Sequence, residues 1–218
     1  KPQTLLINKH TDPAVALDLI RKSQLNYPII LKPDIGFRGL LVKKIHNDNQ
    51  LLGYIKQNNK IALLAQDFIS YPNEMGLFYY RIPNQKDGVV TSITLKQFPT
   101  VIGDGKSTVK ELIMSDHRLQ RYADLLIPLQ NEIIDHVVAK DGSFSLSEIG
   151  NHSKGARFLN GNHLIDSDLN QSMNQFFKQV PDWYYGRLDI KYNTIEDLKQ
   201  GEGFKVIELN GIISEPTH

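Results

Sequence analysis

Short runs of apolar, often β-branched residues alternate with stretches of helical periodicity along this chain of 218 residues. That alternation is typical of an α/β or α+β fold, in which helices cover one face of a sheet. The pattern predicts strands at residues 29–32, 41–45, 61–65, 75–81, 89–97, 185–191 and 205–209. It predicts helices at residues 14–22, 51–57, 108–117, 168–180 and 194–201.

Local signals mark the starts of two of these helices. Thr11-Asp12-Pro13 offers a capping hydroxyl, then an acid, then a proline in the first turn. Thr108 and Glu111 have the spacing of a capping box, in which each residue bonds to the backbone of the other. Both helices are therefore expected to begin at these residues.

Turn residues predict how some of the strands pair. We expect residues 41–45 to return along residues 29–32 as a hairpin partner. We also expect residues 75–81 and 89–97 to be antiparallel neighbours, because the segment between them ends in turn-forming residues.

Two predicted strands near the C-terminal end carry polar residues at every second position. In a strand, alternate side chains point to the same face. Arg187 and Asp189 therefore project together from one strand. Glu208 and Asn210 project together from the other strand. If the strands pair, one polar face gathers these groups, and the apolar residues expected on the core side are Leu188, Ile190, Ile207 and Leu209.

The chemistry of this polar face suits a divalent metal and phosphate. Asp, Glu and Asn supply the hard oxygen ligands that Mg²⁺ prefers, and a neighbouring Arg can hold phosphate oxygens or neutralise charge on a transferred phosphoryl group. The alternative is a salt-bridged face exposed to solvent, which is the commoner case for either strand alone. Both strands together, each backed by aliphatic residues, favour the functional interpretation.

Composition narrows the classes of function. The 25 Lys and Arg residues nearly balance the 24 Asp and Glu residues, which argues against a dedicated nucleic-acid surface. The chain has no cysteine, so thiolate catalysis and Cys-ligated zinc are excluded. We expect a cytoplasmic protein, since no apolar run approaches the roughly 18 residues of a membrane span and no signal peptide is evident. The termini also lead us to expect a segment of a longer chain, and its oligomeric state, including a homo-oligomer, stays open.

The C-terminal strands carry a resemblance to a known family. The strand with Arg187 and Asp189, followed by the strand with Glu208 and Asn210, resembles the metal-binding end of ATP-grasp ligases. The segment Phe204–Gly211, followed by Ser214–His218, resembles a largely uncharacterised bacterial subgroup similar to D-alanine–D-alanine ligase. The resemblance extends over nearly the whole chain. It implies that one or two Mg²⁺, with Mn²⁺ as an alternative, are bound by three residues: Asp189, Glu208 and Asn210. It implies that Arg187 contacts the γ-phosphate and the acyl phosphate formed from it.

The same resemblance implies a fold of two lobes, with ATP in the cleft between two sheets rich in antiparallel strands. The turn near residues 70–73 then divides an N-terminal lobe, residues 1–70, from a C-terminal lobe, residues 71–218.

Upstream segments resemble the phosphate-binding parts of that family. The strand ending in Lys32 resembles the one whose lysine binds the α- and β-phosphates. The following segment resembles the flexible glycine-rich loop, which implies nucleotide contacts from Gly36, Arg38 and Gly39. Glycines suit this role because they let backbone N–H groups approach phosphates. Relatives carry a further glycine where this chain has Leu41, which puts tight closure of the loop in doubt.

Two more segments complete the expected nucleotide site. The stretch after residue 65 resembles the hinge whose main chain binds adenine, formed here by Gln66, Asp67, Phe68 and Ile69. Glu74, seven residues beyond Asp67, has the position of the acid that holds the ribose hydroxyls, and Lys96 corresponds to a second phosphate-binding lysine.

A segment around Lys106, Gly103–Thr108, ends like a Walker A loop and precedes a predicted helix. A Walker A loop needs a glycine five residues before its second glycine, and Thr100 occupies that position. A Walker-type NTPase is therefore a weaker hypothesis than an ATP-grasp site.

We expect an ATP-dependent carboxylate–amine ligase that works through an acyl phosphate. Its partners would be ATP, a small-molecule or peptide carboxylate, and an amine. The alternatives on the same fold are a small-molecule kinase, which releases no inorganic phosphate, and a non-catalytic ATP-binding regulator.

Overall fold

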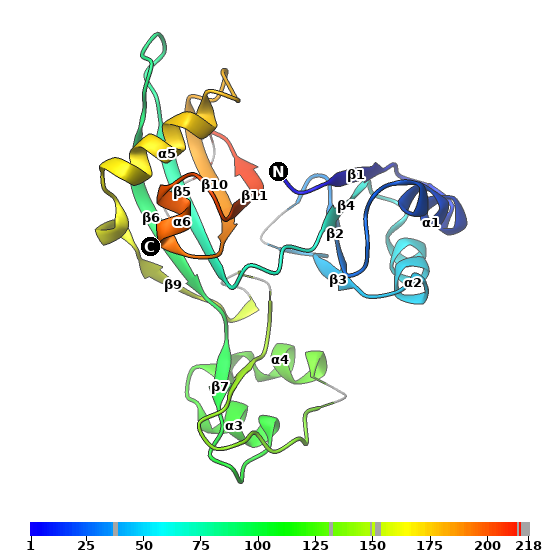
Figure 1. Ribbon diagram of the computed structural model, residues 1–218. Helices are drawn as coiled ribbons and strands as arrows, with labels where there is room; N and C mark the ends of the chain where they lie inside the picture. Colours follow the sequence, from blue (N-terminus) through cyan, green and yellow to red (C-terminus); the bar gives the residue numbers. More distant parts are fainter. Residues whose placement is uncertain (37–38, 131–132, 149, 151–153, 213, 215–218) are drawn as a thin grey trace. The chain divides into compact units, whose positions relative to one another are not determined.

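A computed structural model describes residues 1–36, 39–130, 133–148, 150, 154–212 and 214 of the chain (Figure 1). The chain divides into two compact units. The first consists of Lys1–Tyr71 with Lys205–Ile207, and the second of Pro72–Phe204 with Glu208–His218.

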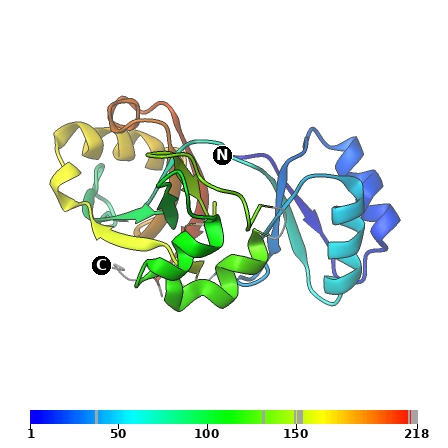
Figure 2. The ribbon, with the colours of Figure 1, turned by 90° about the horizontal axis from the view of Figure 1, so that it is seen from below.

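The first unit is built on a four-stranded antiparallel sheet in the order β1-β4-β2-β3. Its strands are β1 (Thr4–Ile7), β2 (Ile29–Pro33), β3 (Lys43–Ile45) and β4 (Leu63–Asp67). Helices α1 (Pro13–Lys22) and α2 (Asp48–Asn58) lie side by side on one face of this sheet (Figures 1 and 2). The predicted hairpin of β2 and β3 is confirmed, and β1 was not predicted.

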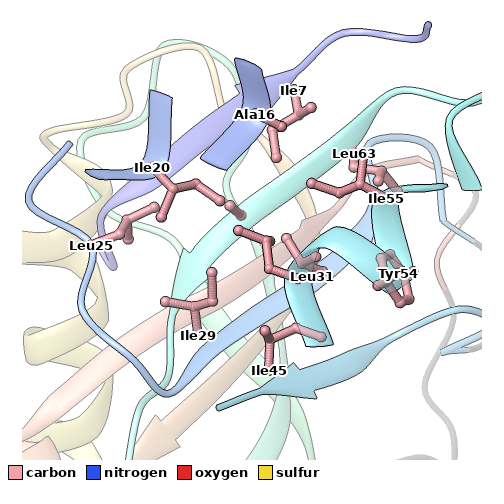
Figure 3. Packing of buried hydrophobic residues seen from close by; sticks show 12 residues of the cluster. Ile7, Ala16, Ile20, Leu25, Ile29, Leu31, Ile45, Tyr54, Ile55 and Leu63 are labelled. Atoms are coloured by element: carbon pink, nitrogen blue, oxygen red, sulfur yellow. The ribbon is translucent and has the colours of Figure 1, made fainter. Parts of the chain in front are cut away.

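The core of this unit lies between the sheet and the two helices (Figure 3). Along β2, Ile29 and Leu31 are fully buried, whereas Ile30 and Lys32 are only partly buried because they point to the opposite face. Helix α1 contributes Ala16 and Ile20, and the remaining core residues include Ile45, Leu51, Ile55, Leu63 and Ala65. The sheet therefore has one apolar face under the helices and one face with polar residues.

The helix caps of this unit differ from the expectation in two ways. The capping oxygen of α1 belongs to Asp12, which accepts from the backbone N–H of Ala14 at 2.8 Å. Thr11, the expected cap, instead donates its hydroxyl to the carbonyl of Asn8. Asp12 has extended backbone angles directly before Pro13, so its side chain is the one that reaches the first turn.

Helix α2 begins three residues earlier than predicted. The side chain of Asn47 accepts from the backbone N–H of Gln50 at 3.0 Å and caps the helix there. An asparagine cap supplies the same hydrogen bond as a serine or aspartate.

The second unit contains a five-stranded sheet in the order β11-β10-β5-β6-β9. Its strands are β5 (Asn73–Tyr80), β6 (Val89–Gln97), β9 (Arg157–Asn160), β10 (Tyr185–Tyr192) and β11 (Phe204–Asn210). The predicted antiparallel pairing of β5 with β6 is confirmed. The two C-terminal strands, β10 and β11, are neighbours in this sheet, which is the condition for a shared polar face.

Helix α5 (Ser167–Phe177) packs across one face of this sheet, and the 3-10 helix η3 (Asn162–Leu164) precedes it (Figure 1). Phe177 of α5 stacks on Tyr79 of β5, with ring centroids 4.0 Å apart. The short helix α6 (Ile195–Lys199) follows β10. The apolar side chains of this sheet face are therefore buried, and the polar face is the opposite one.

A third segment, inserted between β6 and β9, has a small core of its own. Strands β7 (Thr100–Ile102) and β8 (Ser143–Ser145) pair antiparallel, and helices α3 (Val109–Ser115), η1 (Leu119–Tyr122) and α4 (Ala123–Leu129) accompany them. The core is apolar, with Val101, Ile113, Leu126 and Leu146 among its members. The capping box of Thr108 and Glu111 is confirmed in both directions.

The lengths and polarity of the helices decide whether any of them could span a membrane. Among the described residues, every helix is too short or too polar to cross a bilayer.

The packing of the first unit predicts different effects for two leucines. Leu31→Ala should lower the free energy of unfolding by about 2–5 kcal/mol, because it opens a cavity in a fully buried site. Leu6→Ala, at a side chain that is 47% exposed, should lower it by less than about 1 kcal/mol. Urea denaturation followed by circular dichroism measures both values, and equal losses would contradict this description of the core.

Candidate active site

The face of the second sheet opposite α5 is lined by charged residues from adjacent strands. Residues that lie directly opposite each other in an antiparallel pair share a face. Asp189 of β10 lies opposite Gly76 of β5. Glu74 of β5 lies opposite two lysines, Lys96 on β6 and Lys191 on β10. The apolar residues between them, which include Met75, Leu77, Leu188 and Ile190, are fully buried on the other face.

The carboxylate of Asp189 is shared by two cations. Arg187 Nε lies 3.1 Å from Asp189 Oδ1, and Lys96 Nζ lies 3.5 Å from the same oxygen. Lys96 Nζ also lies 2.8 Å from Glu74 Oε1. The side chains of Lys96, Glu74 and Asp189 are at most 9% exposed, so water screens these ion pairs weakly. The structure thus brings together four residues that were predicted as site residues.

Burial and charge act on Lys96 in opposite directions. Burial alone lowers the pKa of its ammonium group, since a charged group loses hydration inside the protein. The carboxylates of Asp189 and Glu74 raise that pKa and outweigh the effect of burial, so the pKa of Lys96 is raised overall. Lys96 therefore remains a cation at neutral pH.

Gly76 makes room for the arrangement around Asp189. A Cβ atom at this position would lie 3.1 Å from Arg187 Cδ and 3.2 Å from Asp189 Oδ1. Few side chains approach that closely, so a larger residue would displace the ion pair. A lone glycine inside a strand signals such a close approach, and that signal was missed at the sequence level.

The predicted metal ligands are a chemically suitable set. Asp189 Oδ2 lies 3.5 Å from the amide of Asn210 on the neighbouring strand, β11. Glu208 lies on the same strand as Asn210 and is exposed. Two carboxylates and one carboxamide fit a Mg²⁺ ion that keeps other ligands from phosphate and water. Among the residues that the structure describes, no group of three His, Asp or Glu side chains is spaced to hold a metal ion.

One expectation for β11 is wrong. Leu209 was placed on the core side by alternation, but it is 43% exposed. β11 is an edge strand of the five-stranded sheet, so it has a neighbouring strand on one side only.

The predicted site residues of the first unit form a separate polar group. Lys32 Nζ donates to Gln66 Oε1 at 3.1 Å, and Gln66 Nε2 donates to Thr4 Oγ1 at 3.0 Å. Asp67 accepts from the backbone N–H of Gln3, at the end of β4. Lys32 and Gln66 are thus brought together on the polar face of that sheet.

The other predicted hinge residues continue from β4. The ring of Phe68 lies under the ammonium group of Lys44, 3.7 Å from its Nζ. Ile69, next along the chain, is half-buried. Their predicted contacts with adenine are main-chain contacts and remain predictions.

The glycine-rich segment shows why a glycine suits position 41. Gly36 is exposed, and Gly39 has a φ of 72°. Leu41 has a φ of 59°, in the left-handed region that favours glycine. Leu41 therefore adopts a backbone conformation in which a glycine would be less strained, and its carbonyl accepts a hydrogen bond from the hydroxyl of Tyr54. Arg38, the remaining predicted contact of this segment, lies outside the described residues.

The segment that ends like a Walker A loop is closed by its own aspartate. Asp104 Oδ1 accepts from the backbone N–H groups of Lys106 and Ser107. The hydrogen bonds from Ser107 and Lys106 hold the pKa of Asp104 down at about 2. The N–H groups that a Walker A loop would present to phosphate are therefore engaged by a carboxylate.

Lys191 is a candidate site residue that was not predicted from the sequence. It is only 8% exposed, and it follows Arg187 and Asp189 at the same two-residue spacing along β10. Its ammonium group lies 5.1 Å from the ring centroid of Phe98. The alternation that singled out Arg187 and Asp189 extends to this lysine and could have identified it.

No protein-family model matches the chain, and no curated protein matches it in sequence. Solved structures do match it. D-alanine–D-alanine ligase from Bacillus anthracis matches with a TM-score of 0.52 and 13% identity, over 97% of this chain and 51% of that chain. VanG D-Ala:D-Ser ligase from Enterococcus faecalis matches with a TM-score of 0.51 and 13% identity, over 96% of this chain and 47% of that chain.

This chain therefore spans about half the length of the two solved structures. The similarity shows the fold, which is the mixed α/β, antiparallel-rich ATP-grasp fold of these ligases.

Because two carboxylates lie beside Lys96, we expect the removal of one of them to change the pKa of its ammonium group. Glu74→Gln should lower the pKa of Lys96, because one of the charges that oppose the effect of burial is removed. Glu202→Gln, at an exposed position, should leave that pKa unchanged. An NMR titration of the lysine ε-carbons in metal-free protein measures the shift. An unchanged pKa in Glu74→Gln would mean that the ion pair does not form in solution.

The close contacts around Gly76 lead us to expect that a larger residue there lowers the stability of the fold. Gly76→Val should lower the free energy of unfolding by about 1–3 kcal/mol, because the added methyl groups overlap Arg187 and Asp189. Gly211→Val is the control, since a Cβ at Gly211 meets nothing within 4 Å. Thermal unfolding compares the variants. Valine otherwise favours strands, so stabilisation by Gly76→Val would refute the close approach.

Proposed function

We propose, from the ATP-grasp fold and the shared carboxylate of Asp189, that this chain binds MgATP and belongs to an ATP-dependent carboxylate–amine ligase. The observation that carries the proposal is the cluster of buried Lys96, Glu74 and Asp189 with partly buried Arg187, and with Asn210 3.5 Å from Asp189. Such a cluster can exchange its internal ion pairs for a divalent cation and a polyphosphate.

Each predicted site residue of the second unit has a proposed role in binding MgATP. Asp189, Glu208 and Asn210 would hold Mg²⁺, which neutralises phosphate charge when bound. Arg187 and Lys96 would contact phosphate oxygens, where cations stabilise the charge of a phosphoryl group in transfer. Glu74 would accept hydrogen bonds from the ribose hydroxyls.

The first unit supplies further proposed contacts. Lys32 would bind the α- and β-phosphates, and the glycine-rich segment, through Gly36, Arg38 and Gly39, would contact the nucleotide. The main chain of residues 66–69 would bind adenine.

The proposed reaction has two steps. An oxygen of the substrate carboxylate forms a bond to the γ-phosphorus while the bond from that phosphorus to the β,γ-bridging oxygen breaks, and ADP leaves. The amine nitrogen then forms a bond to the acyl carbon, inorganic phosphate leaves, and the nitrogen loses a proton. The residues described here act by positioning and by charge, and no covalent bond to the protein is required.

An assay of products tests the reaction. The protein, in its full-length form, is incubated with MgATP and a panel of amino acids and peptides, and ADP and inorganic phosphate are both measured. Equal amounts of ADP and phosphate that depend on both a carboxylate and an amine would support the ligase. ADP without phosphate would favour a small-molecule kinase, and tight MgATP binding with no turnover would favour a regulator.

Three variants locate the nucleotide site. Asp189→Asn should reduce turnover by about 100-fold or more, because a charge that acts on the transferred group is lost. Lys32→Ala should weaken MgATP binding. Lys106→Ala should have little effect, since its loop is closed by Asp104. Loss of ATP binding in Lys106→Ala alone would favour the Walker-type alternative.

A further inference from the structure

Glu74 lies between two buried lysines on the two strands that flank it. In the register of the sheet it is directly opposite Lys96 on β6 and directly opposite Lys191 on β10. All three project to the same face, and directly opposite Cβ atoms are about 5 Å apart. Glu74 is 5% exposed and Lys191 is 8% exposed. Glu74 therefore has a poorly hydrated lysine opposite it on each flanking strand, and its carboxylate forms an ion pair with Lys96.

The two lysines are not equivalent. Lys96 is divided between two carboxylates, with its Nζ 2.8 Å from Glu74 and 3.5 Å from Asp189. Lys191 lies on the far side of Glu74, where its ammonium group is 5.1 Å from the ring centroid of Phe98. A cation over an aromatic ring is attracted to its face, which helps to fix Lys191 independently of Lys96.

The main chain closes another side of Glu74. A Cβ atom at Gly150 would lie only 2.4 Å from Glu74 Oε1, so the backbone of residue 150 lies against the carboxylate. Water has little access from that side. If Lys96 were to leave Glu74, a buried carboxylate would depend on its remaining cationic neighbour, because an unpaired buried charge is strongly destabilising.

We propose that Lys191 is a positioning residue that holds Glu74 for the ribose hydroxyls when Lys96 turns to the nucleotide phosphates. The inference rests on the proposed function and extends it, since it makes Lys191 a determinant of selectivity for ribonucleotides. In this arrangement Lys96 would contact the phosphates, and Lys191 would position Glu74 to bind the ribose hydroxyls.

The test compares the dissociation constants of MgATP and of its 2′,3′-dideoxy analogue by calorimetry. The wild-type protein should prefer MgATP by about 10-fold or more, the effect expected from hydrogen bonds to a charged acceptor. Lys191→Met, which removes the charge and keeps most of the length, should reduce the preference to about 3-fold or less. Lys191→Arg should restore it, and Lys86→Met, at an exposed lysine of the same unit, should leave it unchanged.

A double-mutant cycle separates positioning from general destabilisation. Glu74→Gln should itself abolish the preference, and adding Lys191→Met should reduce it no further. If Lys191 only stabilised the fold, Lys191→Met would weaken both ligands equally and the preference would persist, which would overturn the proposal. If Lys191→Met does not fold, Phe98→Leu loosens Lys191 without removing a charge and should lower the preference at least 2-fold. An unchanged preference there would also overturn it.

The outcomes for the wild-type protein keep this inference apart from the proposed function. No binding of MgATP by the full-length protein would refute the proposed function itself. Binding of MgATP with equal affinity for the dideoxy analogue would refute the roles of Glu74 and Lys191 and leave MgATP binding standing.

Discussion

The carboxylate of Asp189 is the constraint on which the second unit depends. It is buried, so it requires positive partners, and these come from two strands: Lys96 on β6 and Arg187 on β10. The strand between them, β5, must allow the partners to meet, and it does so by placing Gly76 opposite Asp189. A register shift of one residue on any of the three strands would send these side chains to the apolar face under α5. The ion pairs and the hydrophobic core therefore specify the same register.

Much of this arrangement could be predicted from the chain alone, because alternation is a local property. Arg187 and Asp189 share a face whatever their strand pairs with. Which residues lie opposite them depends on strand order and register, which a single sequence does not encode in any short pattern. The alternation that groups Arg187 with Asp189 also reaches Lys191, but the position of Lys191 opposite Glu74 follows only from the register of the strand pair. The exposure of Leu209 has the same origin, because only the strand order makes β11 an edge strand.

Other differences arise from competition between similar local signals. Thr11 and Asp12 can both cap a helix, and only the extended backbone of Asp12 before a proline decides between them. Residues 119–160 carry short helices and strands without a sustained period, so several of their elements were not predicted. Leu41 has a positive φ, which favours glycine, and nothing in the leucine side chain itself predicts that conformation.

The charge balance of the site bears on how it could accept its ligand. Lys96 and Arg187 are held by carboxylates, and Glu74 has lysines on both flanking strands. A nucleotide would add negative charge, and a divalent cation would add positive charge. Under the proposed function Asp189 would help to hold the metal, and Lys96 and Arg187 would contact the phosphates. Each buried charge then keeps a partner throughout, which avoids the large penalty of an unpaired ion. Such an exchange would demand a further cation for Glu74, and Lys191, opposite it on β10, is the residue that we propose for that role.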